Sequence, residues 1–315
     1  MLMARQKTLT LGMLIWREWF QPSMTLKRRP WPVLIGLLYI FINFLLGGLT
    51  HDQILVGSLG LLDAYNEKSR AFLRYFFPFI LTGVVYDSMR YYYWQGIAGH
   101  IHVAEPYFLE KKLFGMMDAG KRVTGNEYFA VHTSTALDLI CGFAYLVFVT
   151  EYLLTGMFLF VTKRYSMLQI FGWCFFTVNV MGFLTYFIYP AAPPWYITQY
   201  GLGPARMDVH SYAAAAQRFD QYLGTHFFDQ IYGRGVDVYG AYPSLHVSYP
   251  FLVSWVAFAL KKFRVAAILF YFLMCFSAVY LQHHYLVDVI LGTSYAIVAL
   301  VMVRFQYSFQ LRKPH

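Results

Sequence analysis

Six long runs of apolar residues recur along the chain, separated by shorter polar stretches. The runs cover roughly residues 71–92, 134–161, 166–190, 245–261, 264–282 and 285–305. A helix that crosses a bilayer needs about 20 consecutive apolar residues, and most of the runs approach or exceed this length. The pattern therefore predicts an all-α fold, a polytopic membrane bundle with six core transmembrane helices.

Two further apolar runs precede this bundle, at residues 33–49 and 54–62. They can form a re-entrant hairpin, or 33–49 can span the membrane alone. The second arrangement places the basic Lys27–Arg29 segment outside, against the rule that short basic segments stay in the cytoplasm. We therefore favour the hairpin. The sequence thus predicts an N-terminal region, 1–70, and a six-helix membrane domain, 71–315.

An amphipathic stretch, Leu9–Phe20, lies near the start of the chain. Its large apolar residues suit a helix lying in the membrane interface. No small-residue cleavage site follows it, so a cleavable signal peptide is not expected.

Basic residues between the apolar runs indicate the orientation of the bundle. By this rule the groups at 68–74, 163–164, 261–264 and 304–313 face the cytoplasm. The segments 93–133 and 191–244 and the turn 282–285 then lie on the extracytoplasmic side. The basic group between Lys111 and Arg122 falls on that side against the rule, which is weaker for long loops.

The composition agrees with an integral membrane protein. Of 315 residues, 58% are hydrophobic and 13% are charged, whereas a soluble domain carries about a quarter charged residues. The net charge of +9 comes from short basic groups beside apolar runs, so it does not indicate nucleic acid binding. Cys141, Cys174 and Cys275 lie inside apolar runs without zinc-site spacing. We expect neither a metal nor a cofactor.

Two polar constellations fall at the predicted outer ends of the last three runs. The first is Gly240–His246, which reads Gly-Ala-Tyr-Pro-Ser-Leu-His. Proline is favoured at a helix start, and the free N–H groups of a first turn bind anions. His246 is placed to exchange a proton with a phosphate oxygen. Ser244, at the same helix start, is a candidate for substrate binding.

The second constellation is Tyr280–Asp288. Residues four apart share one face of a helix, so Asp288 can hold one ring nitrogen of His284 and leave the other free as a nucleophile. His283 points about 100° away and cannot share this carboxylate. It is a further candidate for substrate binding. We expect His246 to face His284 across a gap the size of a phosphate.

These motifs resemble those of the type 2 phosphatidic acid phosphatase superfamily. Pro-Ser-Leu-His246 is similar to its second signature, and His284-x-x-x-Asp288 to its third. The resemblance implies that His284 attacks phosphorus, that Asp288 orients it and that His246 protonates the leaving group. The usual third-motif Arg is Ala278 here, the second-motif Gly is Leu245, and the first motif is absent. With fewer basic clamps, a singly charged phosphodiester suits the site better than a phosphate monoester.

Within that superfamily the chain most resembles the fungal inositol phosphorylceramide synthases. Tyr189–Tyr196, Gly240–His246 and His283–Asp288 are close to their motifs. The resemblance extends over about residues 95–305. Within this range the similarity is looser at His100–Val103, Asp138, Asp208–His210 and Arg218–Asp220. The resemblance implies transfer of phosphoinositol from phosphatidylinositol to ceramide through a phosphohistidine, on the extracytoplasmic side.

Other polar residues are weaker candidates. Arg218 can replace a lost phosphate clamp, because a guanidinium suits pairs of oxygens, or it can be a solvated loop residue. Arg206 is a poorer substitute. His210 can bind the headgroup or be an ordinary loop histidine. Asp138, charged within an apolar run, either orients polar groups of the site or makes a structural hydrogen bond.

The expected partners are a phospholipid donor, a lipid acceptor and the membrane. One alternative is a lipid phosphate phosphatase, in which water replaces the acceptor. Another is a membrane scaffold or transporter without catalysis, which the His/His/Asp set disfavours. The sequence does not reveal an accessory subunit or an oligomeric state.

Overall fold

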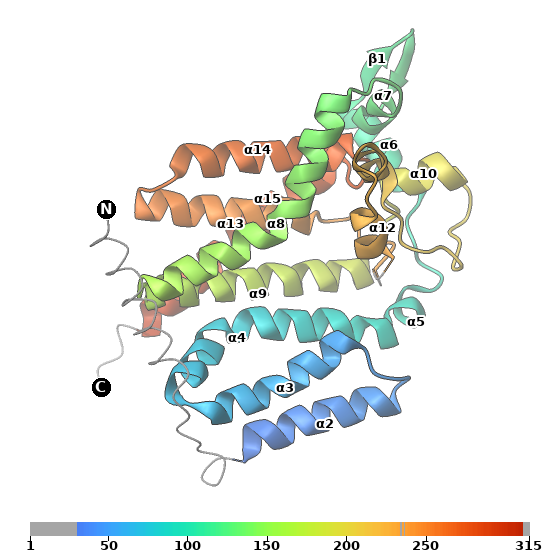
Figure 1. Ribbon diagram of the computed structural model, residues 1–315. Coiled ribbons are helices and arrows are strands. Elements are labelled where there is room, and N and C mark those ends of the chain that lie inside the picture. The colour runs from blue at the N-terminus through green and yellow to red at the C-terminus, as the bar shows by residue number, and fades with distance from the viewer. Residues whose placement is uncertain (1–29, 234, 236, 311–315) are drawn as a thin grey trace. The chain divides into compact units, whose positions relative to one another are not determined.

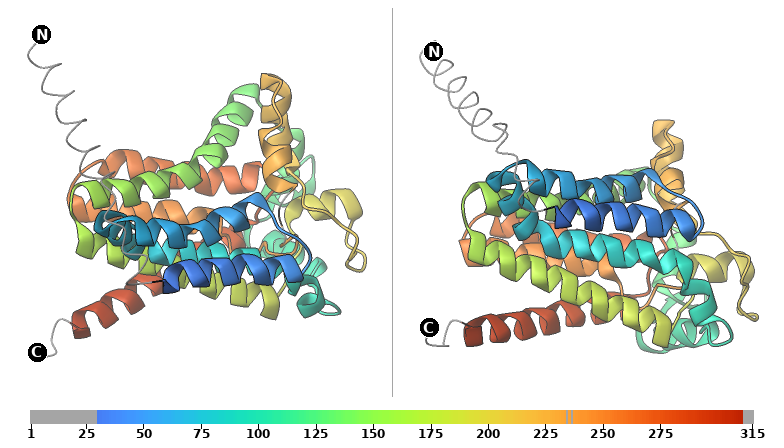
Figure 2. Two further views of the ribbon diagram at one scale, coloured as in Figure 1. Left: turned by 60° about the horizontal axis from the view of Figure 1, so that its bottom comes forward. Right: turned by 90° about the horizontal axis from the view of Figure 1, so that it is seen from below.

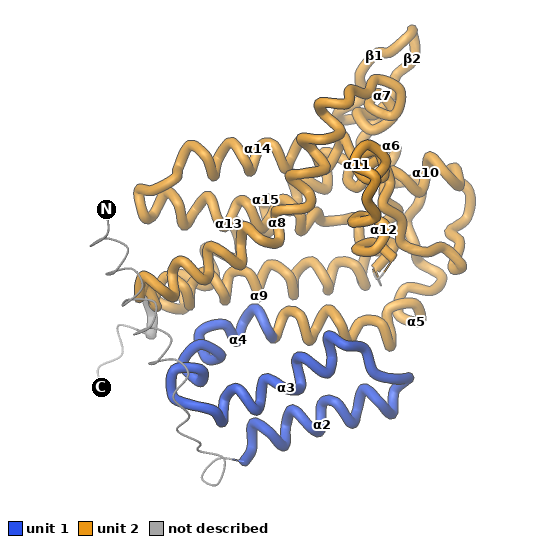
Figure 3. The backbone as a smooth tube through the Cα atoms, viewed as in Figure 1, with its two compact units in different colours: residues 1–80 blue, residues 81–315 orange. Residues whose placement is uncertain are grey.

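The computed structural model describes residues 30–233, 235 and 237–310, and these residues form almost only helices. This confirms the predicted all-α fold class. The chain divides into two compact units, residues up to Ile80 and residues from Leu81 onward (Figure 3). The boundary falls inside one helix, and the predicted division at residue 70 stays a prediction. The expected interfacial helix, Leu9–Phe20, lies outside the described residues.

The first unit holds a pair of helices, α2 (Trp31–Leu45) and α3 (His51–Tyr65), and the start of α4 (Glu67–Ser88). A Cβ on Gly36 would lie 2.0 Å from the carbonyl oxygen of Gly57, so α2 and α3 touch along their backbones. The two N-terminal apolar runs thus pair as a helical hairpin. Whether this hairpin re-enters the membrane stays a prediction.

The second unit is built on five long helices, α8, α9, α13, α14 and α15 (Figure 1). Their bounds are α8 Thr135–Val161, α9 Tyr165–Ile188, α13 Leu245–Leu260, α14 Arg264–Tyr280 and α15 Leu286–Gln310. Helix α13 packs against the other four. These helices, together with α4, follow the six apolar runs of the sequence closely.

Among the described residues, three helices are long and apolar enough to cross a membrane: α8, α9 and residues Leu286–Tyr307 of α15. Helices α13 and α14 are apolar but shorter, with 16 and 17 residues. They are shorter than their runs because Lys261, in the left-handed conformation, ends α13, and because a turn follows Tyr280.

Short elements gather at one end of the five long helices, at the right of Figure 1 and in both views of Figure 2. They are η1 (Met89–Tyr91), α5 (Tyr93–Ile97), α6 (Ala104–Phe114), β1 (Met116–Asp118), β2 (Lys121–Val123), α7 (Gly125–Val131), α10 (Pro194–Tyr200), η2 (Ala214–Ala216), α11 (Gln217–Leu223) and α12 (Phe227–Tyr232). Apart from η1, which lies at the end of the run 71–92, these elements belong to the two segments that the sequence assigns to the extracytoplasmic side.

Backbone bridges join the motif segments at this end. His102 and Gly240 each form a parallel bridge with Ala191. The amide of His102 donates to the carbonyl of Pro190 at 2.8 Å, and that of Ala191 donates to Tyr239 at 2.8 Å. Three motifs that are far apart in the sequence therefore meet in one place.

Candidate active site

Two histidines from different helical segments meet at this end of the second unit. His246 lies in the first turn of α13, and His284 lies in the turn 281–285 between α14 and α15. The Nδ1 atom of His246 is 2.9 Å from Nε2 of His284, which is hydrogen-bond distance. The structure thus brings together the two predicted imidazoles.

The expected phosphate-sized gap between the two rings is wrong for this arrangement. His284 is buried and His246 is partly buried, and the two ring nitrogens are hydrogen-bonded to each other. A phosphoryl group has to break this hydrogen bond to reach His284.

The backbone fixes the other ring nitrogen of His284. Its Nδ1 lies 2.8 Å from the carbonyl oxygen of Ala241 and 3.6 Å from Oδ2 of Asp288. The Nδ1–H group therefore donates to Ala241, and Oδ2 of Asp288 lies within ion-pair distance of the same nitrogen. The expected pairing of Asp288 with one ring nitrogen of His284 is present at this longer distance, with the Ala241 carbonyl as the hydrogen-bond acceptor. The catalytic role of Asp288 stays a prediction.

Asp288 also caps the start of α15. Its Oδ2 accepts a hydrogen bond from the amide of Tyr285 at 2.8 Å, and its side chain is fully buried. Its carboxylate remains close enough to His284 to favour positive charge on that ring.

The hydrogen bonds also define which nitrogen of His284 can attack. With Nδ1 donating to Ala241, Nε2 carries a lone pair, and this lone pair accepts the Nδ1 proton of His246. Burial lowers the pKa of His284 to about 4, although the hydrogen bond to Ala241 opposes the shift. At neutral pH the ring is uncharged and nucleophilic.

Ser244 links the starts of α13 and α15. Its amide donates to the carbonyl of Asp288 at 3.0 Å. A Cβ on Gly292 would lie 2.0 Å from the carbonyl oxygen of Ser244, so only glycine permits this approach. The Ser244 hydroxyl is buried and has no hydrogen-bond partner among the described residues.

His283 points into an aromatic stack. Its ring lies 4.6 Å from Tyr232 and 5.2 Å from Tyr145, centre to centre, and Tyr145 also stacks on His246 at 4.9 Å. Burial lowers the pKa of His283, with further lowering by His246 and His284. Tyr145, from α8, is a site residue that sequence reasoning missed.

Asp138 and Arg218 form a second polar cluster. Nε of Arg218 donates to Oδ1 of Asp138 at 2.6 Å, and the Tyr280 hydroxyl donates to the same oxygen at 2.8 Å. Asp138 lies seven residues before Tyr145 on α8, about 10 Å along one helix face. In the described part of the chain, Nη2 of Arg218 and Oδ2 of Asp138 are buried without hydrogen-bond partners.

The two loop residues that the sequence proposed lie elsewhere. His210 is exposed, and the structure does not place it among the residues that contact the imidazole pair. Arg206 forms an exposed ion pair with Asp208 at 2.7 Å.

Three segments fix the turn that carries His284. The side-chain amide of Asn126 donates to the carbonyl of His284 at 2.9 Å. The amide of Trp195 donates to Gln282 at 3.1 Å, and that of Ala215 donates to Leu281 at 3.2 Å.

Glu110 is another residue that the sequence analysis missed. Its two carboxylate oxygens accept hydrogen bonds from the amides of Leu286 and Val287, both at 3.1 Å. Burial raises the pKa of Glu110, and the two hydrogen bonds oppose this shift. No spacing rule could have found it, because its partners lie more than 170 residues further along the chain.

In the part of the chain that the structure describes, no group of three His, Cys, Asp or Glu side chains is arranged to hold a metal ion. The chemistry that the described groups offer is nucleophilic attack by one imidazole beside a second imidazole able to move a proton.

Comparison with known proteins gives consistent matches. The profile of the PAP2 superfamily matches residues 126–302. The phosphoinositol dihydroceramide synthase of Bacteroides thetaiotaomicron is 37% identical over 270 residues, which cover 84% of this chain and 88% of that protein. No solved structure matches the chain significantly.

Fungal proteins match a smaller part. The inositol phosphorylceramide synthase of Candida albicans is 28% identical over 56% of this chain and 38% of that protein. The inositol phosphorylceramide synthase catalytic subunit AUR1 of Saccharomyces cerevisiae is 31% identical over 42% of this chain and 32% of that protein. The chain thus matches less than half of the length of either fungal protein.

Proposed function

This chain belongs to the PAP2 superfamily, and from that premise we propose that it transfers a phosphoinositol-type headgroup from a phospholipid to the hydroxyl group of a ceramide-like lipid. The resemblance stated from the motifs and the enzyme class, a transferase, are both confirmed by the named relatives. The observation that supports the mechanism is the partly buried hydrogen bond between Nδ1 of His246 and Nε2 of His284.

The first step of the proposed reaction forms a phosphohistidine. Nε2 of His284 attacks the phosphorus of phosphatidylinositol, and the bond from phosphorus to the diacylglycerol oxygen breaks. His246, protonated on both ring nitrogens when the donor is bound, gives one proton to that oxygen and becomes neutral. The carbonyl of Ala241 and the carboxylate of Asp288 stabilise the positive charge that develops on the His284 ring.

The second step returns the enzyme to its starting form. His246 removes the proton from the hydroxyl group of the acceptor lipid, whose oxygen attacks phosphorus. The bond between phosphorus and His284 breaks, and the proton taken by His246 replaces the one it gave in the first step. The two steps together consume no net proton.

A phosphodiester donor fits the surroundings of the imidazole pair. Ala278, at the position of the superfamily's arginine, is fully buried in an apolar cluster, and Leu245 is also buried. Charge balance at the phosphorus therefore favours a group with one negative charge over a monoester with nearly two.

Arg218 and Asp138 are proposed to bind the headgroup away from the phosphorus. Asp138 lies about two helical turns from Tyr145 on α8, and this distance suits contact with a sugar-sized group. The buried Nη2 and Oδ2 atoms offer one donor and one acceptor to a hydroxyl group.

The test uses purified enzyme in detergent with inositol-labelled phosphatidylinositol and ceramide. The variant His284→Ala should lose labelled sphingolipid product by a factor on the order of 10⁴ or more. The matched control is His210→Ala, an exposed histidine outside the imidazole cluster, which should keep at least half of the activity. Turnover by His284→Ala would refute the nucleophile. Release of inorganic phosphate from phosphatidic acid, with no inositol-containing product, would indicate a phosphatase instead.

A further inference from the structure

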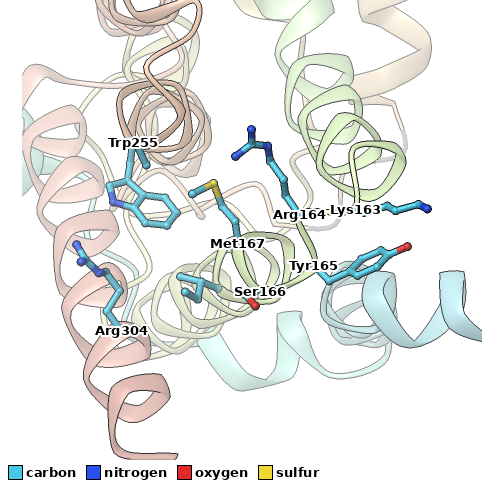
Figure 4. A pocket seen from close by; sticks show the side chains of 9 residues that line it. Lys163, Arg164, Tyr165, Ser166, Met167, Trp255 and Arg304 are labelled. Carbon is cyan, nitrogen blue, oxygen red and sulfur yellow. The ribbon is translucent and has the colours of Figure 1, made fainter. Parts of the chain in front are cut away.

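A hollow of about 450 Å³ lies at the other end of the long helices (Figure 4). It lies where α9 begins and where α13 and α15 approach their C-termini. The residues that line it include Arg164, Met167, Ile170, Trp255, Ala259 and Arg304.

This hollow is far from the imidazole pair. Arg304 follows Asp288 by sixteen residues on α15, which corresponds to about 24 Å along the helix. Helix α9 begins at the hollow and ends beside the motif Tyr189–Tyr196. The hollow is therefore separate from the proposed catalytic site.

Positive charge surrounds the hollow. Arg164 and Arg304 lie on opposite sides of the hollow, whereas Lys163 points away from it (Figure 4). Both arginines are exposed, and among the described residues neither forms an ion pair with a carboxylate.

The rest of the lining is apolar and aromatic. Trp255 and Met167 face the same space as the two guanidinium groups (Figure 4). Phe258 and Met302, which are close in sequence to the lining residues Ala259 and Arg304, are half exposed. Tryptophan is enriched where a membrane meets water, and basic pockets between membrane helices on the cytoplasmic side bind anionic lipid headgroups.

We propose that this hollow binds the phosphate group of an anionic phospholipid, with Arg164 and Arg304 as the two sides of the clamp. Paired guanidinium groups bind phosphate oxygens through charge-assisted hydrogen bonds. Trp255 and the apolar residues beside it contact the start of the acyl chains. The bound lipid is in the opposite leaflet from the donor lipid, so it stabilises the protein without being its substrate.

The test measures thermal unfolding of the full-length enzyme in detergent while phosphatidylglycerol or zwitterionic phosphatidylcholine is titrated. Phosphatidylglycerol should raise the midpoint, and phosphatidylcholine should not. Arg164→Gln and Arg304→Gln should each raise the lipid concentration for a half-maximal shift about fivefold, since one basic side chain contributes about 1 kcal/mol. The matched control, Lys262→Gln, removes one charge from the same end but lies outside the hollow, so it should behave like the wild type.

Unchanged midpoints of the two arginine variants in phosphatidylcholine show that they fold. If either midpoint falls, native mass spectrometry of the folded fraction measures bound phosphatidylglycerol directly. A third titration uses inorganic phosphate. If millimolar phosphate competes with phosphatidylglycerol, the hollow is a general phosphate site. If phosphate has no effect on the shift caused by phosphatidylglycerol, the hollow is a lipid headgroup site. The proposal would be overturned if Lys262→Gln weakened the response to phosphatidylglycerol as much as the arginine variants do, or if phosphatidylglycerol did not shift the unfolding midpoint of the wild type.

Discussion

At the scale of single residues, the Ala241 carbonyl accepts the hydrogen bond from His284 that the sequence assigns to Asp288. It accepts the Nδ1 proton of His284 and so leaves Nε2 free to attack. A backbone carbonyl has no side-chain signature, which is why the motifs point to the carboxylate alone. The identities of His246 and His284 were predictable because each lies in a recognisable polar motif.

This geometry sets the expected cost of removing the Asp288 charge. Where a carboxylate alone fixes the tautomer, its removal costs about 10⁴ in rate. Because Ala241 fixes the tautomer here, Asp288→Asn should lower kcat only about 10- to 100-fold, through lost charge stabilisation. The measurement compares kcat of Asp288→Asn with that of His284→Ala. An equal loss of kcat in both variants would mean that Asp288 contacts Nδ1 of His284 directly during the reaction.

The lowered pKa of His284 predicts acid sensitivity. The pKa is about 4 in the folded protein and near 6.5 in the unfolded chain, so the unfolded chain binds more protons between these values. The stability contribution is complete above pH 6.5 and falls by roughly 3 kcal/mol as the pH drops to 4. Buried His283 acts in the same direction.

Unfolding temperatures measured from pH 7 to pH 4 check this prediction. His284→Asn, which cannot take up a proton, should show a shallower fall than the wild type. His210→Asn, at an exposed position, should follow the wild type. A wild-type curve that is flat over this range would contradict the buried, neutral state of His284.

At the scale of the elements, the apolar runs predict the long helices well but not how their ends meet. The start of α15 shows why. Tyr285 donates to Asp288, and Leu286 and Val287 donate to Glu110, so the helix begins two residues after His284. The two contacts with Glu110 depend on a segment more than 170 residues away, which periodicity along the chain cannot detect.

The close approach of α13 and α15 gives a prediction at this scale. In Gly292→Ala the new Cβ would lie 2.0 Å from the Ser244 carbonyl oxygen, so the two helix starts must separate. We expect destabilisation of about 1–3 kcal/mol and loss of most activity, measured by thermal unfolding and turnover. Gly83→Ala is the matched control, because its Cβ meets nothing within 4 Å, and it should keep full activity. Normal activity of Gly292→Ala would show that the contact is not required.

At the scale of the whole molecule, the charge pattern leads us to propose that the imidazole pair faces the extracytoplasmic side. The basic groups at 163–164 and 261–264 lie at the ends of the helices opposite to that pair. Membrane orientation depends on loop charges, which the sequence shows directly, so this prediction needs no structure and stays a prediction. The assembly of the site could not, because it needs the bridges between His102, Ala191 and Gly240.

Labelling of intact cells with a membrane-impermeant maleimide tests this orientation. Met207→Cys, on an exposed loop near the imidazole end, should be labelled in intact cells. Lys262→Cys, at the basic end, should be labelled only after the membrane is opened. The unaltered chain is the background control, because it measures any labelling of the buried Cys141 and Cys174 and of the partly buried Cys275. The reverse labelling pattern would place the catalytic site in the cytoplasm.

The direct contact between His246 and His284 also has a consequence for inhibitor design. A competitive inhibitor that enters between the rings has to replace both halves of the bond that it breaks. It needs an acceptor for the Nδ1 proton of His246 and a donor, or an electrophilic atom, for the lone pair of His284. A compound with only an acceptor leaves a buried nitrogen unpaired, at a cost of about 1–3 kcal/mol in affinity. Hydroxyphosphonates, which carry both functions, are therefore better starting compounds than simple sulfonates.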